Sequence, residues 1–547
     1  MKLLWMLLRT SRWVVLLSIL CGATSGASSA GMISLITRVL ASGGQATRES
    51  ALQFVLLGAL VLSSRIGSQM LLNTLHHRVV YELRVGLSRR ILSTPLRQLE
   101  ELGAHRLMAA LNNDILSVST GLLVLPTIVI NLAVVLGCLA YLAWLSWWVF
   151  LSFLAFLMVG VLTYWLPASY SLRLMKGSRE TYDMLQKHFR TLTEGLKELK
   201  IHHLRRHAFL DEDMDGTANK LRRMDTTSSN VDSANVSWGL FLFLGFIGLL
   251  LFALPAFGAV KFEALTGYVL TILYMQQPLD VVIGNFHGLG QSAVALRKLE
   301  ALTLSVEPEV LPASANATFR RLELVGITHV YRREDDEDGR FTLGPINLSF
   351  EPGQLVFLVG GNGSGKTTLA KLIIGLYAPE GGTLLWDGEP VTDARREHYR
   401  QLFSVIFSDF HLFDRLLGLG TQERASEVQG YLERLHLSHK VKVVDGKLST
   451  TALSQGQRKR LALLVCWLED RPFYVFDEWA ADQDPVFKAV FYEQLLPDLK
   501  KRGKTVFVIT HDDRYFHLCD RLIRLDSGQL LTDEPQRVAL SQAGNSR

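Results

Sequence analysis

The chain has 547 residues, of which 48% are hydrophobic and 20% charged, and its formal net charge is +5. This length exceeds one ordinary domain of about 150 residues. The mean hydropathy of +0.20 is high for a water-soluble protein, and long uncharged segments produce it, so the first expected partner is the lipid bilayer. The small net charge favours no nucleic-acid partner. The four cysteines lack CxxC spacing, which favours neither a zinc site nor a disulfide framework.

Six segments of the first half are long and apolar enough, or nearly so, to cross a membrane. Crossing about 30 Å of hydrocarbon takes about 20 apolar residues in a helix, because unpaired backbone groups are not tolerated there. We therefore predict a polytopic α-helical membrane domain of the exporter type with six transmembrane helices. The segments are Trp13–Ile36, Leu52–Leu72, Gly121–Ala143, Trp147–Leu166, Trp238–Leu254 and Leu265–Ile283.

The first apolar segment has a second interpretation as a secretory signal. Lys2, Arg9 and Arg12 precede it, and the small residues of Ala23–Ala30 resemble a cleavage region. Small residues also let membrane helices pack closely, and the apolar run resumes at Met32. We therefore expect this segment to be retained as a membrane helix.

Two long connections in the first half are rich in arginine and lysine, namely His76–Val118 and Ser171–Val236. Basic residues next to membrane segments mark cytoplasmic loops, so both connections and both termini are expected in the cytoplasm. Apolar residues at near-helical spacing predict that membrane helices continue into these loops. The turns between them would then lie where a soluble domain could contact them.

Polar residues recur every four positions on two predicted membrane helices. Arg65, Gln69 and Asn73 share one face of the second helix, and Gln276 and Asp280 share one face of the sixth. Polar groups are costly in lipid, so these faces are candidates for the cargo path. The alternative is that they lie near cytoplasmic helix ends, where Arg65 reaches the interface and Asp280 meets water.

The second half changes character after a linker at 304–318. From Phe319 onward, short β-branched runs alternate with helical patterns, which is typical of an α/β fold. The predicted organisation is a transmembrane domain at 1–303, the linker, and an α/β phosphate-loop nucleotidase domain at 319–547.

A phosphate-binding loop follows the predicted strand Leu355–Val359. Residues 360–367 match G-x-x-x-x-G-K-[ST] in full. The glycines let successive backbone N–H groups face phosphates, Lys366 reaches the β- and γ-phosphates, and Thr367 offers a hydroxyl to Mg²⁺. ATP and Mg²⁺ are therefore the predicted cofactors. The predicted contacts are Gly360, Asn362, Gly363, Ser364, Gly365, Lys366, Thr367 and Thr368.

A second predicted strand, Phe473–Phe476, ends in Asp477 and Glu478. A carboxylate at such a strand end can hold the hydration shell of Mg²⁺, which we assign to Asp477. The next carboxylate, Glu478, can orient or deprotonate the attacking water. The alternative, an acidic turn after a core strand, is weakened by the complete phosphate loop upstream.

The run Leu453–Gln457 resembles the signature sequence of ATP-binding cassette (ABC) proteins, and further family features follow in order. The resemblance implies that Ser454 and Gly456 close over nucleotide bound to an opposite cassette, so that two cassettes are needed. It also implies three roles for single residues: adenine stacking for Tyr331, a link between the two sites for Asp484, and a γ-phosphate contact for the switch histidine His511.

Two positions depart from the family pattern. Where the family has a glutamine that senses Mg²⁺ and the membrane domain, this chain has Ser408. A shorter hydroxyl would act on the metal only through water. The signature also has Gln455 where glycine is usual, which we expect to be tolerated because the phosphate contacts implied by the resemblance are Ser454 and Gly456.

Within the family, the chain resembles half-size exporters of the bacterial cyclic-peptide branch, which includes exporters of microcin, syringomycin-type lipopeptides and the pyoverdine precursor. Most similar exporters carry a Thr-Ser-Ala-Leu-Asp-like run where this chain has Trp479–Asp484. The resemblance covers nearly the whole chain. The runs that carry it are Gly360–Lys366, Leu402–Ser404, Asp477–Pro485 and His511–Asp513.

The resemblance implies a homodimer in the bacterial inner membrane that hydrolyses ATP and exports a peptide, either a cyclic peptide, a lipopeptide or a peptide siderophore precursor. Two alternatives share the same motifs: a lipid or lipopeptide flippase, and a membrane-anchored regulatory ATPase. Six spans exceed what anchoring requires, which disfavours the regulatory ATPase.

Overall fold

The structure is a computed structural model that describes residues 2–41, 47–253, 262–302, 318–332, 340–419 and 424–535. The chain divides into two compact units. One comprises 1–86 and 108–302, and we call it the helical unit. The other comprises 87–107 and 303–547, and we call it the cassette unit. The predicted linker lies almost wholly outside the described residues.

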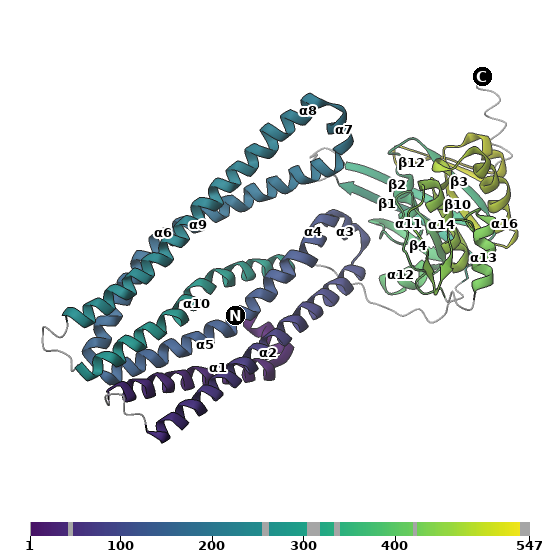
Figure 1. Cartoon of the computed structure of the whole chain (residues 1–547). Helices are drawn as coiled ribbons and strands as arrows, with labels where there is room; N and C mark the ends of the chain where they lie inside the picture. The colour runs from purple at the N-terminus through teal and green to yellow at the C-terminus, as the bar shows by residue number, and fades with distance from the viewer. Residues whose placement is uncertain are drawn as a thin grey trace. The chain divides into compact units, whose positions relative to one another are not determined.

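The helical unit consists of long helices joined by short connections (Figure 1). The helices that lie wholly or partly in it are, in chain order, α1 Lys2–Ala41, α2 Arg48–Leu92, α4 Ala104–Ala109, η1 Ala110–Asp114, α5 Ile115–Leu145, α6 Trp147–Glu194, α7 Leu196–Ile201, α8 His203–Ala208, η2 Phe209–Asp215, α9 Gly216–Gly248, η3 Leu249–Ala253 and α10 Phe262–Ala301. Within this unit α5 packs along α10, and α6 packs along α9. Most helices continue far beyond the predicted spans, as the amphipathic loop patterns indicated.

Five stretches of the described residues are long and apolar enough to cross a membrane: Leu16–Leu40, Arg48–Leu92, Arg106–Leu145, Trp147–Glu194 and His203–Phe252. Helix α10 contains the sixth predicted segment, Leu265–Ile283. The helices and strands agree with the predicted fold class, a helical membrane domain followed by an α/β domain.

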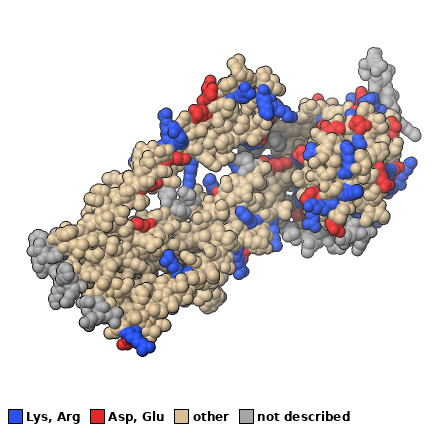
Figure 2. All heavy atoms as spheres, in the orientation of Figure 1, with Lys and Arg blue, Asp and Glu red and all other residues tan. Residues whose placement is uncertain are grey.

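Large apolar side chains cover the outside of the helical unit, as lipid contact requires. Trp165 is 67% exposed and Phe252 is 83% exposed, and both lie in predicted spans. Figure 2 shows few charged side chains over much of the visible face of this unit. The interior is also apolar, with Phe153, Phe246 and Tyr268 fully buried. Apolar residues on all sides are typical of a helix bundle that sits in a bilayer.

The cassette unit is built on two sheets. One is antiparallel, in the order β2 (Arg340–Phe350), β1 (Leu322–Arg332), β4 (Gly381–Trp386) and β5 (Glu389–Pro390). The other has the order β12, β11, β3, β10, β9, β6, in which β12 pairs antiparallel and all other neighbours pair parallel. Its strands are β12 Gln529–Pro535, β11 Arg521–Asp526, β3 Leu355–Gly360, β10 Thr505–Ile509, β9 Phe473–Asp477 and β6 Phe403–Ile406.

Helices cover both faces of the parallel sheet. Along β3, Leu355 and Phe357 belong to one hydrophobic cluster, whereas Val356 and Leu358 belong to another. Because side chains alternate across a strand, these two clusters lie on opposite faces, and a strand buried on both faces needs a continuous apolar sequence.

The remaining elements are α3 Leu96–Leu102, α11 Lys366–Ile373, α12 Asp393–Arg400, α13 Ala425–Arg434, β7 Val443–Val444, β8 Lys447–Leu448, α14 Gln455–Glu469, η5 Trp479–Asp482, α15 Pro485–Ala489, η6 Val490–Leu495, α16 Leu496–Lys501 and η7 Asp513–Leu518.

The sheet order brings the predicted site residues together. Strands β3, β10 and β9 are neighbours and run parallel, so their carboxyl ends lie at one edge of the sheet. The phosphate loop follows β3, Thr510 and His511 follow β10, and Asp477 ends β9. This edge is the usual place for a ligand in an open α/β sheet.

Candidate functional site

The phosphate loop connects β3 to α11 and depends on two glycines in positive-φ conformations. Gly363 has φ +78° and Gly365, which begins α11 as its N-cap, has φ +98°. Other residues rarely adopt such conformations, so the turn requires glycine. A Cβ atom on Gly365 would also lie 3.0 Å from the Leu343 side chain. The loop therefore delivers the backbone N–H groups at the start of α11 to one point, as phosphate binding requires.

Two polar side chains of this loop lie almost fully buried. Lys366 donates hydrogen bonds from Nζ to the backbone oxygens of Gly360 and Gly361, at 3.1 and 2.9 Å. Within the described residues the Ser364 hydroxyl, 3% exposed, has no hydrogen-bond partner. A buried hydroxyl without a partner costs free energy, and a phosphate oxygen would satisfy it. The loop thus fits the phosphates of ATP.

Asp477 and Thr367 form the predicted Mg²⁺ position. The Thr367 hydroxyl donates to Asp477 Oδ2 at 2.9 Å, and Asp477 is 1% exposed. Burial raises the pKa of Asp477, and the hydrogen bond from Thr367 partly offsets this. The described residues contain no cluster of three or more His, Cys, Asp or Glu side chains able to hold a metal. One hydroxyl and one carboxylate suit Mg²⁺, which keeps waters and takes substrate phosphate oxygens as its other ligands.

Asp409 adds a negative charge beside Asp477. It follows Ser408 in the turn after β6, and its charge raises the pKa of Asp477 further. Ser408 itself is exposed. The sequence reasoning considered only Ser408 at this turn, although the adjacent acid was a visible signal. Asp409 is therefore a second residue of this turn, besides Ser408, that can influence bound Mg²⁺.

Glu478 directly follows β9 in a left-handed backbone conformation, with φ +50°. Such a conformation is strained for a residue with a side chain and persists only where neighbouring contacts hold it. Its backbone N–H donates to the oxygen of Ile509 at 3.1 Å, and its backbone oxygen accepts from Lys459 Nζ at 2.8 Å. Glu478 Oε1 lies 3.1 Å from His511 Nε2. The predicted base and the predicted switch histidine are thus hydrogen-bonded partners.

Trp479 fixes the turn after Glu478. Its side chain is fully buried and stacks on Phe491 with ring centroids 4.3 Å apart. Its Nε1 donates to the backbone oxygen of Lys459 at 2.9 Å. Lys459, also buried, pairs with Asp482 at 2.7 Å. A small aliphatic residue at position 479 could not make these contacts, so this chain builds the turn differently from a Thr-Ser-Ala-Leu-Asp-like run.

The signature run begins α14. Ser454 is the N-cap, and its hydroxyl accepts from the Gln457 N–H at 3.4 Å, while the Gln457 side chain accepts from the Ser454 N–H at 3.3 Å. This capping box fixes the helix start. A Cβ on Gly456 would lie 2.7 Å from the backbone oxygen of Asp482, which explains the glycine. Gln455, the unusual residue, donates to the Asp482 carboxylate at 3.1 Å, so it connects the signature to the turn after Glu478.

Asp484 caps the next helix, α15. Its carboxylate accepts from the Phe487 N–H at 2.9 Å and pairs with Arg460 of α14. The hydrogen bond from Phe487 is the main reason that the pKa of Asp484 lies below its ordinary value. Tyr331 lies in β1, opposite Phe341 in the strand pairing, but its side chain falls outside the described residues.

Helix α3 belongs to the cassette unit, although it lies between membrane helices in the sequence. Glu100 pairs with Lys371 of α11 at 2.7 Å and accepts a hydrogen bond from the Tyr377 hydroxyl. Arg97 pairs with Glu380 at 2.6 Å. The sequence indicated a turn here that a soluble domain could contact, but it did not identify the contact residues. Through Lys371, α3 touches the helix whose first turn forms the phosphate loop.

The residues predicted to line the cargo path lie on α2 and α10 of the helical unit. Arg65, Gln69 and Asn73 share an exposed face of α2, whose buried face carries Ser64 and Ser68 instead. On α10, Gln276 is half-buried and Asp280 is exposed. In the single chain Arg65, Gln69, Asn73 and Asp280 are therefore not buried, and Gln276 is only half-buried.

Comparison with known proteins agrees with this fold. The family described as ABC transporter matches residues 343–481, and the family described as ABC transporter transmembrane region matches residues 13–279. The chain belongs to the ABC transporter family, and it joins a transmembrane exporter region to an ATP-hydrolysing domain. ATP-binding protein SyrD of Pseudomonas syringae pv. syringae is 38% identical to it over 97% of this chain and 96% of its own length.

Two further likenesses extend over the whole length. The ATP-dependent lipid A-core flippase of Burkholderia orbicola (strain AU 1054) is 26% identical over 100% of this chain and 94% of its own. A solved structure of a bacterial Atm1-family ABC exporter with ATP bound matches with a TM-score of 0.75 and 16% identity, over 98% of this chain and 97% of that one. This last likeness shows the shared fold.

Proposed function

We propose that two copies of this chain form an ATP-driven exporter of a cyclic peptide, lipopeptide or peptide siderophore precursor in the bacterial inner membrane, with both termini and the cassette unit in the cytoplasm. The observation that carries the peptide cargo is the run after Glu478. Trp479 is built into the turn by its stacking on Phe491, and this run resembles that of cyclic-peptide exporters. The 38% identity to SyrD over nearly the full length supports the same assignment.

In this proposal the phosphate loop holds ATP. Backbone N–H groups from Gly360 to Thr368, the Ser364 hydroxyl and Lys366 bind the phosphates, and Thr367 with Asp477 holds Mg²⁺. Bound Mg²⁺ would neutralise charge that develops on the phosphate oxygens. Glu478 accepts the proton of the attacking water, and His511 orients the Glu478 carboxylate.

The second copy completes each site. Ser454 and Gly456 lie at the start of α14, where helix N–H groups favour an anion, and in this proposal they close over nucleotide bound to the other copy. Closure would draw the two cassettes together, and hydrolysis would release them. Helix α3 transmits the movement of the cassettes to the membrane helices. Glu100 contacts α11, and the chain on both sides of α3 continues into α2 and α5.

Lipid transport is the second candidate, favoured by the likeness to the lipid A-core flippase over the whole chain. The two candidates differ in what stimulates ATP hydrolysis. We would purify the chain, reconstitute it in vesicles, and measure ATPase activity with a labelled cyclic peptide or with lipid A added. Stimulation by the peptide alone supports peptide export. Stimulation by lipid A alone contradicts it, and stimulation by neither favours a regulatory ATPase.

A further inference from the structure

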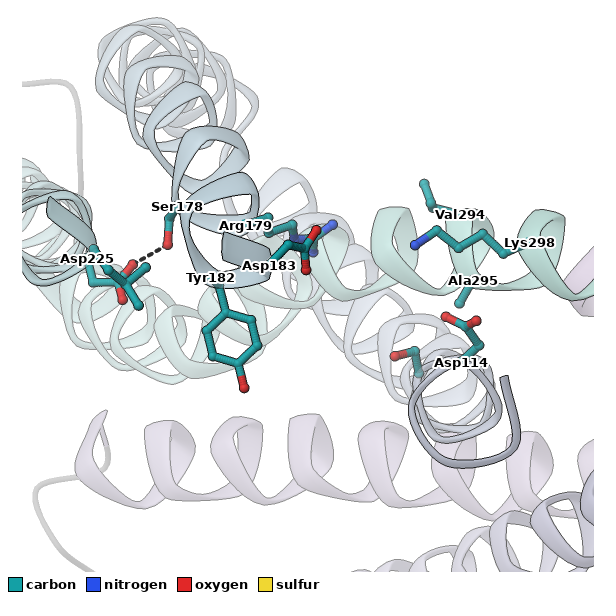
Figure 3. Close-up of a pocket in the computed structure, with 11 residues that line it drawn as sticks. Asp114, Ser178, Arg179, Tyr182, Asp183, Asp225, Val294, Ala295 and Lys298 are labelled. Carbon is teal, nitrogen blue, oxygen red and sulfur yellow. Dashed lines mark hydrogen bonds between the residues drawn. The ribbon is translucent and has the colours of Figure 1, made fainter. Parts of the chain in front are cut away.

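A polar cavity of about 330 Å³ lies within the helical unit, away from every residue predicted from the sequence to contact cargo. Its volume falls in the range of about 300–1,000 Å³ that is usual for small-molecule sites. Four stretches of helix line it, namely those around Asp114, Arg179, Asp225 and Lys298. Figure 3 shows Arg179 and Asp183 projecting from α6 on the side of α10.

The cavity lies beyond the membrane ends of the predicted spans. Arg179 follows the end of the fourth span, Leu166, and Lys298 follows the end of the sixth, Ile283, in each case by about 20 Å at about 1.5 Å of helix rise per residue. Asp114 and Asp225 precede the third and fifth spans on the same side. In the proposed topology this side is cytoplasmic, so cargo bound here would be taken from the cytoplasm.

The charged side chains in the cavity are mostly not paired with one another. Asp225 accepts a hydrogen bond from the Ser178 hydroxyl at 2.5 Å. For the other four charged groups, Asp114, Asp183, Arg179 and Lys298, no ion pair within 4.0 Å forms with any described residue. Burial raises the pKa of Asp114, and the charge of Lys298 partly offsets this, so these two groups attract each other beyond ion-pair distance. Arg179 and Asp183 lie one turn apart on α6, a spacing that allows an ion pair, yet they form none with each other. The charges of Arg179 and Asp183 are thus available to a ligand.

We propose that this cavity is a cytoplasmic entry site that binds peptides bearing both a cationic and a carboxylate group. Asp114 and Asp183 bind the ammonium or guanidinium group, and Lys298 and Arg179 bind the carboxylate. Tyr182 also lines the cavity, and its ring offers an apolar surface to the same peptide. This inference rests on the proposed peptide export and adds the site and the charge pattern of the cargo.

The charge balance of the lining disfavours a phosphorylated lipid headgroup. Three carboxylates and two cations line the cavity, so its lining is net negative and would repel a phosphate. A peptide with separated positive and negative groups can match both kinds of side chain. The same reasoning predicts that loss of either charge on the peptide weakens binding.

The test uses the full-length protein in lipid nanodiscs and a fluorescent cyclic octapeptide that contains one lysine and one aspartate. Two analogues replace the lysine by norleucine or the aspartate by asparagine. The acidic variant carries Asp114→Asn with Asp183→Asn, and the basic variant carries Arg179→Gln with Lys298→Gln. The control variants change exposed neighbours that do not line the cavity, Glu180→Gln and Arg297→Gln.

By fluorescence anisotropy, we expect the acidic variant to bind the parent peptide roughly tenfold more weakly than the unaltered protein does. It should bind the norleucine analogue as tightly as the unaltered protein binds that analogue. The basic variant should lose affinity for the parent peptide and not for the asparagine analogue. This crossed pattern cannot arise from misfolding, because each variant retains normal binding of one peptide. Unchanged binding by both variants, or equal losses in the controls, would overturn the inference.

The outcomes also separate this inference from the proposed function. If the unaltered protein binds the octapeptide and hydrolyses ATP faster in its presence, peptide export stands, and only the variants decide the cavity. If the unaltered protein shows neither binding nor stimulation while lipid A stimulates hydrolysis, peptide export fails and the entry site fails with it.

Discussion

Lys459 of α14 donates a hydrogen bond from Nζ to the backbone oxygen of Glu478 at 2.8 Å. The lysine is buried, and its charge is balanced by Asp482 at 2.7 Å. Helix α14 begins with the signature residues, which are predicted to contact nucleotide bound to the second copy. The contact therefore links this helix to Glu478, the residue predicted to activate water. Glu478 has φ +50°, a conformation that needs such support.

Lys459→Met should therefore slow ATP hydrolysis more than it weakens ATP binding, since the phosphate loop is untouched. It should also lower the free energy of unfolding by about 1–3 kcal/mol, because the backbone oxygen of Glu478 is left with the Ala481 N–H at 3.2 Å and the Asp482 carboxylate loses its ion-pair partner. Arg458→Met, one position earlier, is the matched control. Steady-state ATPase and binding of a fluorescent ATP analogue measure the two effects. A variant with normal turnover would show that the contact does not support catalysis.

The contact of Glu100 with Lys371 and Tyr377 predicts a different kind of defect. Glu100→Gln removes the charge that holds Lys371 and should reduce transport per ATP hydrolysed, while basal ATPase changes less than about twofold. Glu101→Gln is the control, because among the residues that the structure describes the Glu101 carboxylate pairs with Arg97 of the same helix alone. Measuring uptake and hydrolysis in the same vesicles gives the ratio. An unchanged ratio in Glu100→Gln would exclude a role for this pair in coupling.

The turn after β6 yields a prediction about the missing glutamine. Asp409→Asn removes a negative charge that acts on Asp477, so the pKa of Asp477 should fall toward its ordinary value. Less charge near the metal position should also raise the Mg²⁺ concentration needed for half-maximal ATPase. Ser408→Ala should change that concentration less than Asp409→Asn does. The opposite order would assign the metal effect to the serine.

His329 predicts an acid-sensitive cassette unit. It is 1% exposed, stacks on Tyr377, and its Nδ1 has no hydrogen-bond partner among the described residues. Burial, followed by the nearby Arg97 charge, lowers its pKa below 6.5. With a lowered folded-state pKa, the unfolded chain takes up the proton first, so stability is lost as pH falls below 6.5 through the folded-state pKa. His329→Phe should reduce this loss, measured as the change in Tm between about pH 7.5 and about pH 5.5. An equal change in both proteins would contradict it.

The local geometry of the phosphate loop follows from the sequence, because a contiguous run encodes it. The phosphate loop needs glycine at Gly363 and Gly365 for backbone reasons alone, and the strand before it reads as a buried apolar run. The turn of Asp477 and Glu478 follows from the same logic. These features depend on neighbours in sequence, which a pattern can show.

Contacts between distant residues could not be predicted in the same way. Nothing near Lys459 in the sequence indicates that it supports Glu478, and Glu100 lies 271 positions before Lys371. The cavity around Asp114 draws on four separate helices, so helical spacing within any one of them gives no signal. The polar faces at Arg65 and Asp280 did show such spacing, yet they lie exposed in the single chain.

Uptake into inverted membrane vesicles shows whether ATP hydrolysis at Glu478 drives peptide export. The measurement compares ATP-dependent accumulation of a labelled cyclic peptide by the unaltered chain and by Glu478→Gln. We expect the unaltered chain to accumulate the peptide. The variant should still bind ATP but lose uptake and hydrolysis together by about 10²-fold or more. Peptide uptake that persists in Glu478→Gln, or that is absent from the unaltered chain supplied with ATP, would contradict this expectation.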